Sequence, residues 1–356
     1  MILLDVPFIP DNQYVQFLNS NAEKIYSVHF SLYSDVVPDA RYKFRLLEPQ
    51  DIIRHLEKIK VPKKYVLMNS RFHLPSDYLD SDHLNIVLDK LTLMSDASVL
   101  DGIIYADQYY LEALSGTGRE VCSRLEAVPS VNCIIDSFDK AVSFLSAVSC
   151  TNFRMPGKLV LDRSLNRKIR ELSDIVQKCR TEYPEIKLSL LANEGCLYQC
   201  PFKLAHDSHI SMINADANVS IDTYEINRTC GCMKYLQNSP HSLFKSPFIR
   251  PEDVDKYADT VDIIKICGRT LGTGFLQNVV SAYIKKAYPG NLLKLMDTME
   301  WMADRFYVAN KNLPDDFFYV MTTCPKVCST CSYCSTLFDE HVRTLDFVLK
   351  GVRSGK

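Results

Sequence analysis

Short apolar runs, separated by amphipathic stretches, repeat along most of the chain. The runs are too continuously apolar for a sheet with one face in water, so each is predicted to be a fully buried strand. The N-terminal run that begins at Met1 is predicted to be the first strand. The others are Ile25–Phe30, Lys64–Met68, Gly102–Ala106, Lys158–Asp162, Ile186–Ala192 and Val261–Ile266.

The stretches between these runs carry helix signals. Asp51–Ile59 and Leu165–Val176 place apolar residues at helical spacing, with Ser164 predicted as the N-cap of the second helix. Pro251–Tyr257 resembles a helix start because proline is favoured in the first turn. Asn238–Arg250 is rich in serine and proline and is predicted to be a loop.

Repeated strand–helix alternation predicts a parallel sheet. The chain has no G-x-G-x-x-G and no G-x-x-x-x-G-K phosphate loop, which favours a barrel over a nucleotide-binding doubly wound sheet. We therefore predict an α/β fold, a (β/α)8 TIM-like barrel over residues 1–310, with a small cysteine-rich C-terminal appendage over residues 311–356. Barrel chemistry lies at the carboxyl ends of the strands, so residues that follow strands are the candidates for a site.

Composition limits the classes of protein and the cellular location that the sequence is compatible with. The 356 residues are 47% hydrophobic, enough for a sizeable core, and a net charge of −2 gives no reason to expect non-specific binding to nucleic acid or membranes. The chain lacks the run of roughly 20 apolar residues that spans a bilayer, and its N-terminus lacks signal-peptide features. A cytoplasmic, reducing location is predicted, where grouped cysteines bind metal or do redox chemistry more often than they form disulfides.

Two cysteine pairs follow the middle strands. Cys196 and Cys200 lie in a loop after the predicted strand that ends at Ala192, and Pro201 follows them. Cys230 and Cys232 lie about 30 residues further on, after what is predicted to be the next strand. Four thiolates are the usual ligand set of a 4Fe–4S cluster, so these cysteines are predicted to bind one.

A third group stands near the C-terminus, with spacings of 4, 3 and 3 residues: Cys324, Cys328, Cys331 and Cys334. This run predicts a second metal centre. An iron–sulfur cluster is favoured because three short spacings wrap one cluster, whereas zinc sites separate two cysteine pairs by a longer loop; zinc remains an alternative. Radical S-adenosylmethionine enzymes use a similar cysteine spacing, but their three ligands follow the first barrel strand. Here the cysteines lie near the C-terminus, and the fourth cysteine would occupy the iron position that must stay open, so this type of site is disfavoured.

The remaining cysteines have plainer interpretations. Cys122, Cys133, Cys150 and Cys179 are scattered among apolar or helical stretches and are predicted to be inert buried thiols. Cys267 lies at a strand end and is predicted to be a core thiol, with an extra metal ligand as the alternative.

Polar residues after the strands supply candidate catalytic side chains. Arg71, Arg163 and Arg269 could each hold an anionic group, Arg269 together with Lys265; a surface arginine is the alternative. Asp107 could orient a substrate, although capping of the next helix is favoured. His206, six residues after Cys200, is a candidate proton donor or a plain loop histidine.

Three segments of the chain resemble the collagenase-like peptidase family U32. Lys158-Leu-Val-Leu-Asp-Arg163 resembles the family's strand that ends in arginine. Asn227-Arg-Thr-Cys230-Gly-Cys232 resembles its Asn-Arg-Gly-x-Cys region, and Lys265-Ile-Cys267-Gly-Arg269 resembles its Lys-Ile-Glu-Gly-Arg strand. The likeness covers roughly residues 95–290; Cys267 replaces the family's glutamate, and the C-terminal cysteine run is not a usual part of the family.

The resemblance implies a barrel whose four cysteines hold a 4Fe–4S cluster, in proteins that hydroxylate a ring on RNA or a quinone precursor without oxygen. Proteolysis has little support here, because H-E-x-x-H and G-x-S-x-G are both absent and no cysteine has an obvious His–Asn pairing.

The prediction is therefore an iron–sulfur enzyme that modifies RNA, a peptide or a small anionic metabolite, with an electron-donor protein as a partner and hetero- or homodimerisation open. The alternatives are a non-catalytic iron–sulfur partner subunit or maturation factor and, more weakly, a U32-type peptidase.

Overall fold

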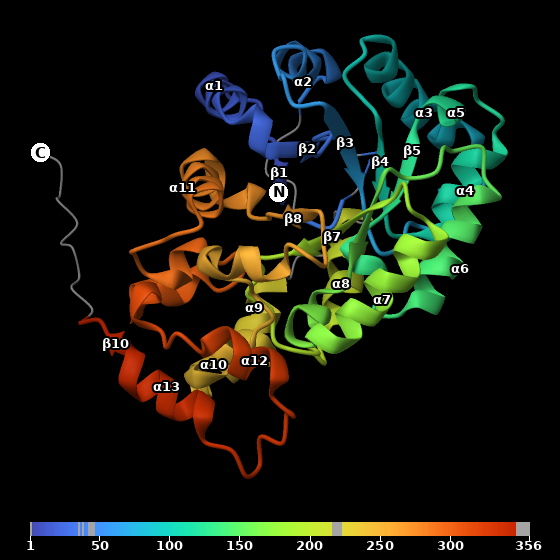
Figure 1. Cartoon of the computed structure of the whole chain (residues 1–356). Helices are drawn as coiled ribbons and strands as arrows, with labels where there is room; N and C mark the ends of the chain where they lie inside the picture. Colours follow the sequence, from blue (N-terminus) through green and yellow to red (C-terminus); the bar gives the residue numbers. More distant parts are fainter. Residues whose placement is uncertain (1, 35, 38, 42–46, 216–222, 347–356) are drawn as a thin grey trace, which may run out of the picture.

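The computed structural model describes residues 2–34, 36–37, 39–41, 47–215 and 223–346. Eight parallel strands form one sheet in the order β5-β4-β3-β2-β1-β8-β7-β6, with helices outside it (Figure 1). The strands are β1 Leu3–Pro7, β2 Ile25–Phe30, β3 Lys63–Met68, β4 Gly102–Tyr105, β5 Glu126–Pro129, β6 Lys158–Leu161, β7 Lys187–Leu191 and β8 Ile263–Lys265. The predicted (β/α)8 barrel is confirmed.

The barrel is nearly closed where β5 meets β6. Here the backbone of Arg154, just before β6, forms two hydrogen bonds in place of a regular strand ladder. Its N–H donates to the carbonyl of Leu125 at 2.9 Å, and its carbonyl accepts from the N–H of Ala127 at 3.1 Å. The Gly157 N–H then donates to the Glu126 carboxylate at 2.9 Å. These hydrogen bonds pair backbone groups of β5 with the segment that leads into β6, and so join the two edges of the sheet.

The helices around the barrel are α1 Asn12–Ser20, α2 Pro49–Leu56, α3 Ser81–Asp96, α4 Gln108–Gly116, α5 Val121–Arg124, α6 Phe138–Ser149, α7 Ile169–Glu182, α8 Lys203–Ala215, α9 Thr223–Thr229, α10 Cys232–Asn238 and α11 Gly272–Lys285. The 3-10 helices are η1 Ala22–Lys24, η2 Val131–Cys133, η3 Arg163–Arg167, η4 Pro240–Lys245, η5 Pro251–Tyr257, η6 Arg269–Leu271, η7 Leu292–Leu295, η8 Glu300–Asp304 and η9 Asn310–Asn312. Among the described residues, no helix has the length and apolar character needed to cross a membrane.

Three local predictions are corrected. Ser164 does not cap a helix, because Asp162 caps η3 by accepting from the Ser164 N–H at 2.9 Å. Cys230 follows the helix α9 and not a strand. The predicted loop Asn238–Arg250 contains the short helix η4.

The C-terminal part of the chain packs on the barrel through a second hydrophobic core. It contains α12 Phe317–Thr323 and α13 Tyr333–His341, and its strands β9 Phe306–Val308 and β10 Val342–Thr344 pair antiparallel. Both α13 and α10 contact η4, and Figure 1 shows α12 and α13 gathered beside α9 and α10. The predicted division at residues 310 and 311 thus falls between two paired strands.

Inside the barrel, charged side chains meet on one buried carboxylate. Strand pairing sets Asp5 of β1 beside Ser27 of β2 and Lys265 of β8. Asp5 is fully buried; it accepts from Lys265 Nζ at 2.9 Å, pairs with Lys158 Nζ at 2.8 Å, and lies 2.9 Å from His29 Nδ1. Ser27 Oγ donates to Asp5 and accepts from Lys158, both at 2.9 Å.

This interior ionic cluster holds two ammonium groups on one carboxylate. Burial would raise the pKa of Asp5, but Lys158 and Lys265 hold it well below its usual value. Burial and Lys265 lower the pKa of His29 to about 3, so its ring is neutral at physiological pH. The cluster therefore carries a net positive charge at the centre of the barrel.

Asp5→Asn is expected to destabilise the fold by about 3–5 kcal/mol, because it leaves two buried ammonium groups without an anionic partner. Urea unfolding followed by circular dichroism measures this change. The control is Asp51→Asn, which breaks only the exposed Asp51–Arg54 pair and is expected to cost less than about 1 kcal/mol. Equal costs for the two variants would contradict a structural role for the interior ionic cluster.

Candidate functional site

A pocket of about 60 Å³ opens at the carboxyl ends of the strands, directly above the interior ionic cluster. His29 and Lys265 belong to both the cluster and the pocket wall. The mouth pocket is lined by His29, Ala40, Arg41, Leu67, Asn69, Ile104, Ser130, Val131, Asn132, Leu191, Glu194, Lys203, Asp207, Lys265, Cys267 and Arg269. This is the edge at which (β/α)8 barrels carry their chemistry.

Most cations of the mouth are held by carboxylates. Arg41 pairs with Asp297 at 2.7 Å, and Arg269 pairs with Asp39. Asp297 raises the pKa of Arg41, and Asp39 is 3% exposed. These arginines are therefore fixed in position, with their charges largely compensated.

One carboxylate of the mouth is shared by two cations. Lys203 Nζ lies 2.5 and 2.7 Å from the two oxygens of Asp207 and 3.2 Å from Asn132 Oδ1. Arg71 NH2 reaches the same carboxylate at 3.5 Å. Burial raises the pKa of Asp207, but Lys203 outweighs it and lowers the pKa. Like Asp5, Asp207 is therefore a buried carboxylate shared by two cations.

A second pocket of about 210 Å³ adjoins the first and is rich in thiols. Its wall includes Arg163, Cys196, Cys200 and Lys203, and Lys203 lines the mouth pocket as well. Arg163 forms an ion pair with Glu194, a residue of the mouth pocket. The thiol pocket and the mouth pocket are therefore joined by shared side chains.

Three of the predicted cluster ligands approach one another here. The side chains of Cys196 and Cys200 interact with each other; this interaction raises the pKa of Cys196 well above its usual value and lowers the pKa of Cys200 to about 7. Cys232 interacts electrostatically with both thiols. Within the described ranges, no three His, Cys, Asp or Glu side chains stand close enough to hold a metal ion.

Cys230 lies apart from the other three. It is exposed, and its thiol donates to the carbonyl of Ile226 at 3.5 Å. Gly231 connects it to Cys232, at a position where a Cβ would lie 2.6 Å from the Asn227 side-chain oxygen. Cys230 is thus exposed, whereas Cys232 is half-buried.

Most other predicted site residues of the barrel lie in or beside the two pockets. Arg269 lines the mouth pocket, Arg163 lines the thiol pocket, and Arg71 reaches the mouth through Asp207. His206 follows Lys203 on α8; burial and Lys203 lower its pKa to about 4. Cys267 lines the mouth pocket and its thiol donates to Asn193 Oδ1 at 3.4 Å.

Asp107 lies outside both pockets and serves a helix. It is the N-cap of α4 and accepts from the Tyr110 N–H at 3.3 Å. It also accepts from the Tyr78 hydroxyl at 2.7 Å and lies 3.1 Å from His73 Nδ1. Burial would raise the pKa of Asp107, but the bonds from His73 and Tyr78 lower it.

The site residues that the sequence did not indicate are Arg41, Asn132, Glu194, Lys203 and Asp207. Lys203 and Asp207 are four residues apart on α8, a spacing that predicts an ion pair on one helix face. That signal alone does not show that the face turns toward the barrel mouth.

The fold and these pockets define a (β/α)8 barrel protein with a cation-rich mouth beside a group of thiols. No protein-family model matches the chain. It is 32% identical over 246 residues to a Methanocaldococcus jannaschii protein named as an uncharacterized protease, which covers 68% of this chain and 67% of that relative. The chain belongs to the U32 peptidase family.

Solved structures also resemble the chain. A U32 peptidase structure aligns with a TM-score of 0.48 and 17% identity, over 75% of this chain and 94% of that one. A probable 3-DHS dehydratase from Bacillus anthracis aligns with a TM-score of 0.41 and 12% identity, over 80% and 98%. The barrel assignment rests on the strand pairing described above and not on these scores.

Asp107→Ala is expected to lower the free energy of unfolding by about 1–2 kcal/mol at pH 7, because α4 loses its cap. The folded-state pKa of Asp107 lies below its unfolded value. Its stabilisation is therefore complete above the unfolded pKa of about 4 and is lost as the pH falls through the folded value. Urea unfolding of both proteins at pH 7 and at pH 3 measures the difference.

The matched control for this prediction is Asp89→Ala, which removes an exposed partner of Arg119 and is expected to change little at either pH. A difference between wild type and Asp107→Ala that stays constant down to pH 3 would contradict the capping role of the ionised carboxylate.

Proposed function

We propose that the protein is an iron–sulfur enzyme whose mouth pocket binds an anionic substrate. The observation that carries the proposal is the meeting of Cys196, Cys200 and Cys232 next to a cation-rich pocket at the catalytic edge of the barrel. Thiolates are the ligands that iron–sulfur clusters prefer, and three of them approach one another from a loop and the start of α10.

Thiols are the right donor type for such a cluster, which would draw them closer together than they lie in the described residues. Cys200 and Cys232 are half-buried against the second hydrophobic core, which would limit solvent around the iron. Arg163 and Lys203 act electrostatically on Cys196 and would balance the negative charge of the thiolates. A cluster held there would supply one-electron redox chemistry or a Lewis-acidic iron.

The side chains of the mouth would bind and orient the substrate. At Asp5 and again at Asp207, two cations share one carboxylate, so the mouth offers positive charge that no protein carboxylate fully balances. A carboxylate or phosphate group placed against Lys265 would balance it. Asn69, Ser130 and Asn132 add neutral hydrogen-bonding groups at the same pocket.

Peptide hydrolysis is the second candidate. Its support is the name of the archaeal relative, which is called a protease. The half-buried Cys200 at the barrel mouth would then be the nucleophile. A peptide-cleavage assay on chelator-treated, metal-free protein separates the two candidates: cleavage that persists without iron and is lost in Cys200→Ala would support the peptidase.

Anaerobically purified Cys196→Ser/Cys200→Ser protein is expected to hold at least about four fewer iron atoms and four fewer acid-labile sulfides per chain than wild type. Metal and sulfide analysis with electron paramagnetic resonance measures the loss. Cys150→Ser is the control, because this thiol, predicted to be buried, is in fact exposed at the C-terminal end of α6, away from the mouth. Iron-free wild-type protein would refute the proposed function.

Lys265→Met is expected to weaken dianion binding about tenfold or more while leaving the fold intact, because Asp5 keeps Lys158 as its partner. Calorimetric titration with inorganic phosphate and with succinate, compared with acetate, tests the pocket's charge. Lys178→Met, which removes an exposed lysine of α7, is the control. Equal dianion affinity in Lys265→Met and Lys178→Met would place anion binding elsewhere.

A further inference from the structure

The four C-terminal cysteines face one cavity. Cys324 directly follows α12, and Cys334 lies in the first turn of α13. Cys328 and Cys331 are exposed and lie between these helices, outside any helix or strand. All four line a cavity of about 290 Å³, and Cys334 interacts electrostatically with each of the other three. Two helix ends therefore present thiols to a loop that carries two more; within the described residues no three of these thiols yet lie close enough together to hold a metal ion, so a bound cluster would draw the loop inward.

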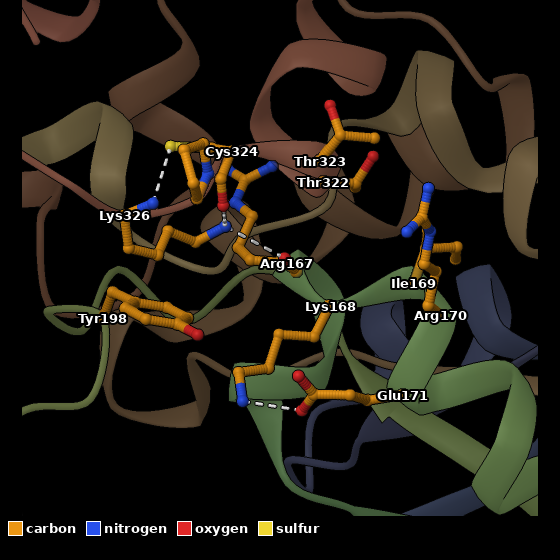
Figure 2. A pocket seen from close by; sticks show the side chains of 11 residues that line it. Arg167, Lys168, Ile169, Arg170, Glu171, Tyr198, Thr322, Thr323, Cys324 and Lys326 are labelled. Atoms are coloured by element: carbon orange, nitrogen blue, oxygen red, sulfur yellow. Dashed lines mark hydrogen bonds and ion pairs between the residues drawn. The ribbon is translucent and has the colours of Figure 1, made fainter.

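The backbone after Cys324 turns back onto its sulfur. The Lys326 N–H donates to Cys324 Sγ at 3.4 Å (Figure 2). The backbone φ of Lys326 is 64°, in the left-handed region that residues other than glycine rarely adopt. The Lys326 ammonium is held by the carbonyls of Cys324 at 2.7 Å and Arg167 at 3.2 Å. The backbone that follows Cys324 therefore holds its sulfur in place.

A lysine stands in the wall of this cavity. Lys245 lines the cavity and acts on Cys334, whereas burial lowers the pKa of His241, so that its ring is neutral at physiological pH. Four thiolates on iron leave a net negative charge, and Lys245 would balance part of it.

The same cysteines border the loop of the first cysteine pair. A neighbouring cavity of about 380 Å³ is lined by Cys324, Cys328 and Cys334 on one side and by Leu197, Tyr198 and Phe202 on the other. Cys200, Cys232 and Cys334 all pack against the second hydrophobic core. A metal centre at the C-terminal cysteines would therefore fix the segment that supports the thiol pocket of the barrel mouth.

We propose that Cys324, Cys328, Cys331 and Cys334 bind a second iron–sulfur cluster, separate from the barrel mouth. The helices fix Cys324 and Cys334, and the loop brings Cys328 and Cys331 onto the iron. Each of the three spacings is shorter than the loop that separates the two cysteine pairs of a zinc site, so all four ligands would wrap one compact cluster. The cluster would join α12 to α13 and hold both against the loop around Tyr198.

The test uses Cys328→Ser/Cys331→Ser, because both thiols are exposed and their replacement opens no cavity in the core. Anaerobically purified full-length protein is expected to lose about four iron atoms and four sulfides per chain relative to wild type and to Cys150→Ser. Limited proteolysis of the variant is expected to cut between α12 and α13 at least tenfold faster.

Comparing the two double variants distinguishes failure of this proposal from failure of the proposed function. Unchanged iron and sulfide in Cys328→Ser/Cys331→Ser would overturn this proposal even where Cys196→Ser/Cys200→Ser loses iron. Zinc in the wild type that disappears in the C-terminal variant would overturn it too, because the site would then be a zinc site. Loss of iron and sulfide in the C-terminal variant alone would support it while refuting the proposed function.

Discussion

The Asp5 carboxylate is the point on which the barrel interior depends. It lies where β1 has β8 and β2 as its neighbours, and Lys158 reaches it from β6, so one buried group ties together side chains of four strands. A buried ion pair contributes little net stability compared with apolar packing, but removing one partner is costly. The arrangement is therefore better understood as serving the pocket above it than as a source of stability. It keeps two ammonium groups and a neutral imidazole in fixed positions beneath the mouth.

The same arrangement recurs at the mouth, and this links interior charge to surface chemistry. Lys203 and Arg71 share Asp207 as Lys158 and Lys265 share Asp5. Lys203 also lines the thiol pocket, so a group bound at the mouth would lie next to Cys196 and Cys200. An anion and the thiolates would then be balanced by one set of cations, and the occupancy of each site would affect the other electrostatically.

The sequence predicted the barrel but not all of its parts. Strands such as β2 and β3 are continuous apolar runs and were found, while β5 was missed because Glu126-Ala-Val-Pro129 is short and contains a charge and a proline. Asp5 lies in the middle of β1 and Lys158 at the start of β6, and only the folded sheet shows that both side chains point inward. Arg41 and Lys203 follow no predicted strand, and long-range packing alone brings them to the mouth.

For the cysteines too, spacing in the sequence predicted some groupings, whereas others depend on how distant segments pack. Spacing alone set apart the C-terminal group, whose members line one cavity because a short loop joins two helix ends. Spacing also paired Cys230 with Cys232, yet Cys230 is exposed and bonds to the carbonyl of Ile226, whereas Cys232, at the start of α10, interacts with Cys196 and Cys200. Short spacing places cysteines on one segment, but the direction in which each thiol points depends on where that segment packs. For this reason the mouth thiols required the fold to be known, whereas the C-terminal cysteines did not.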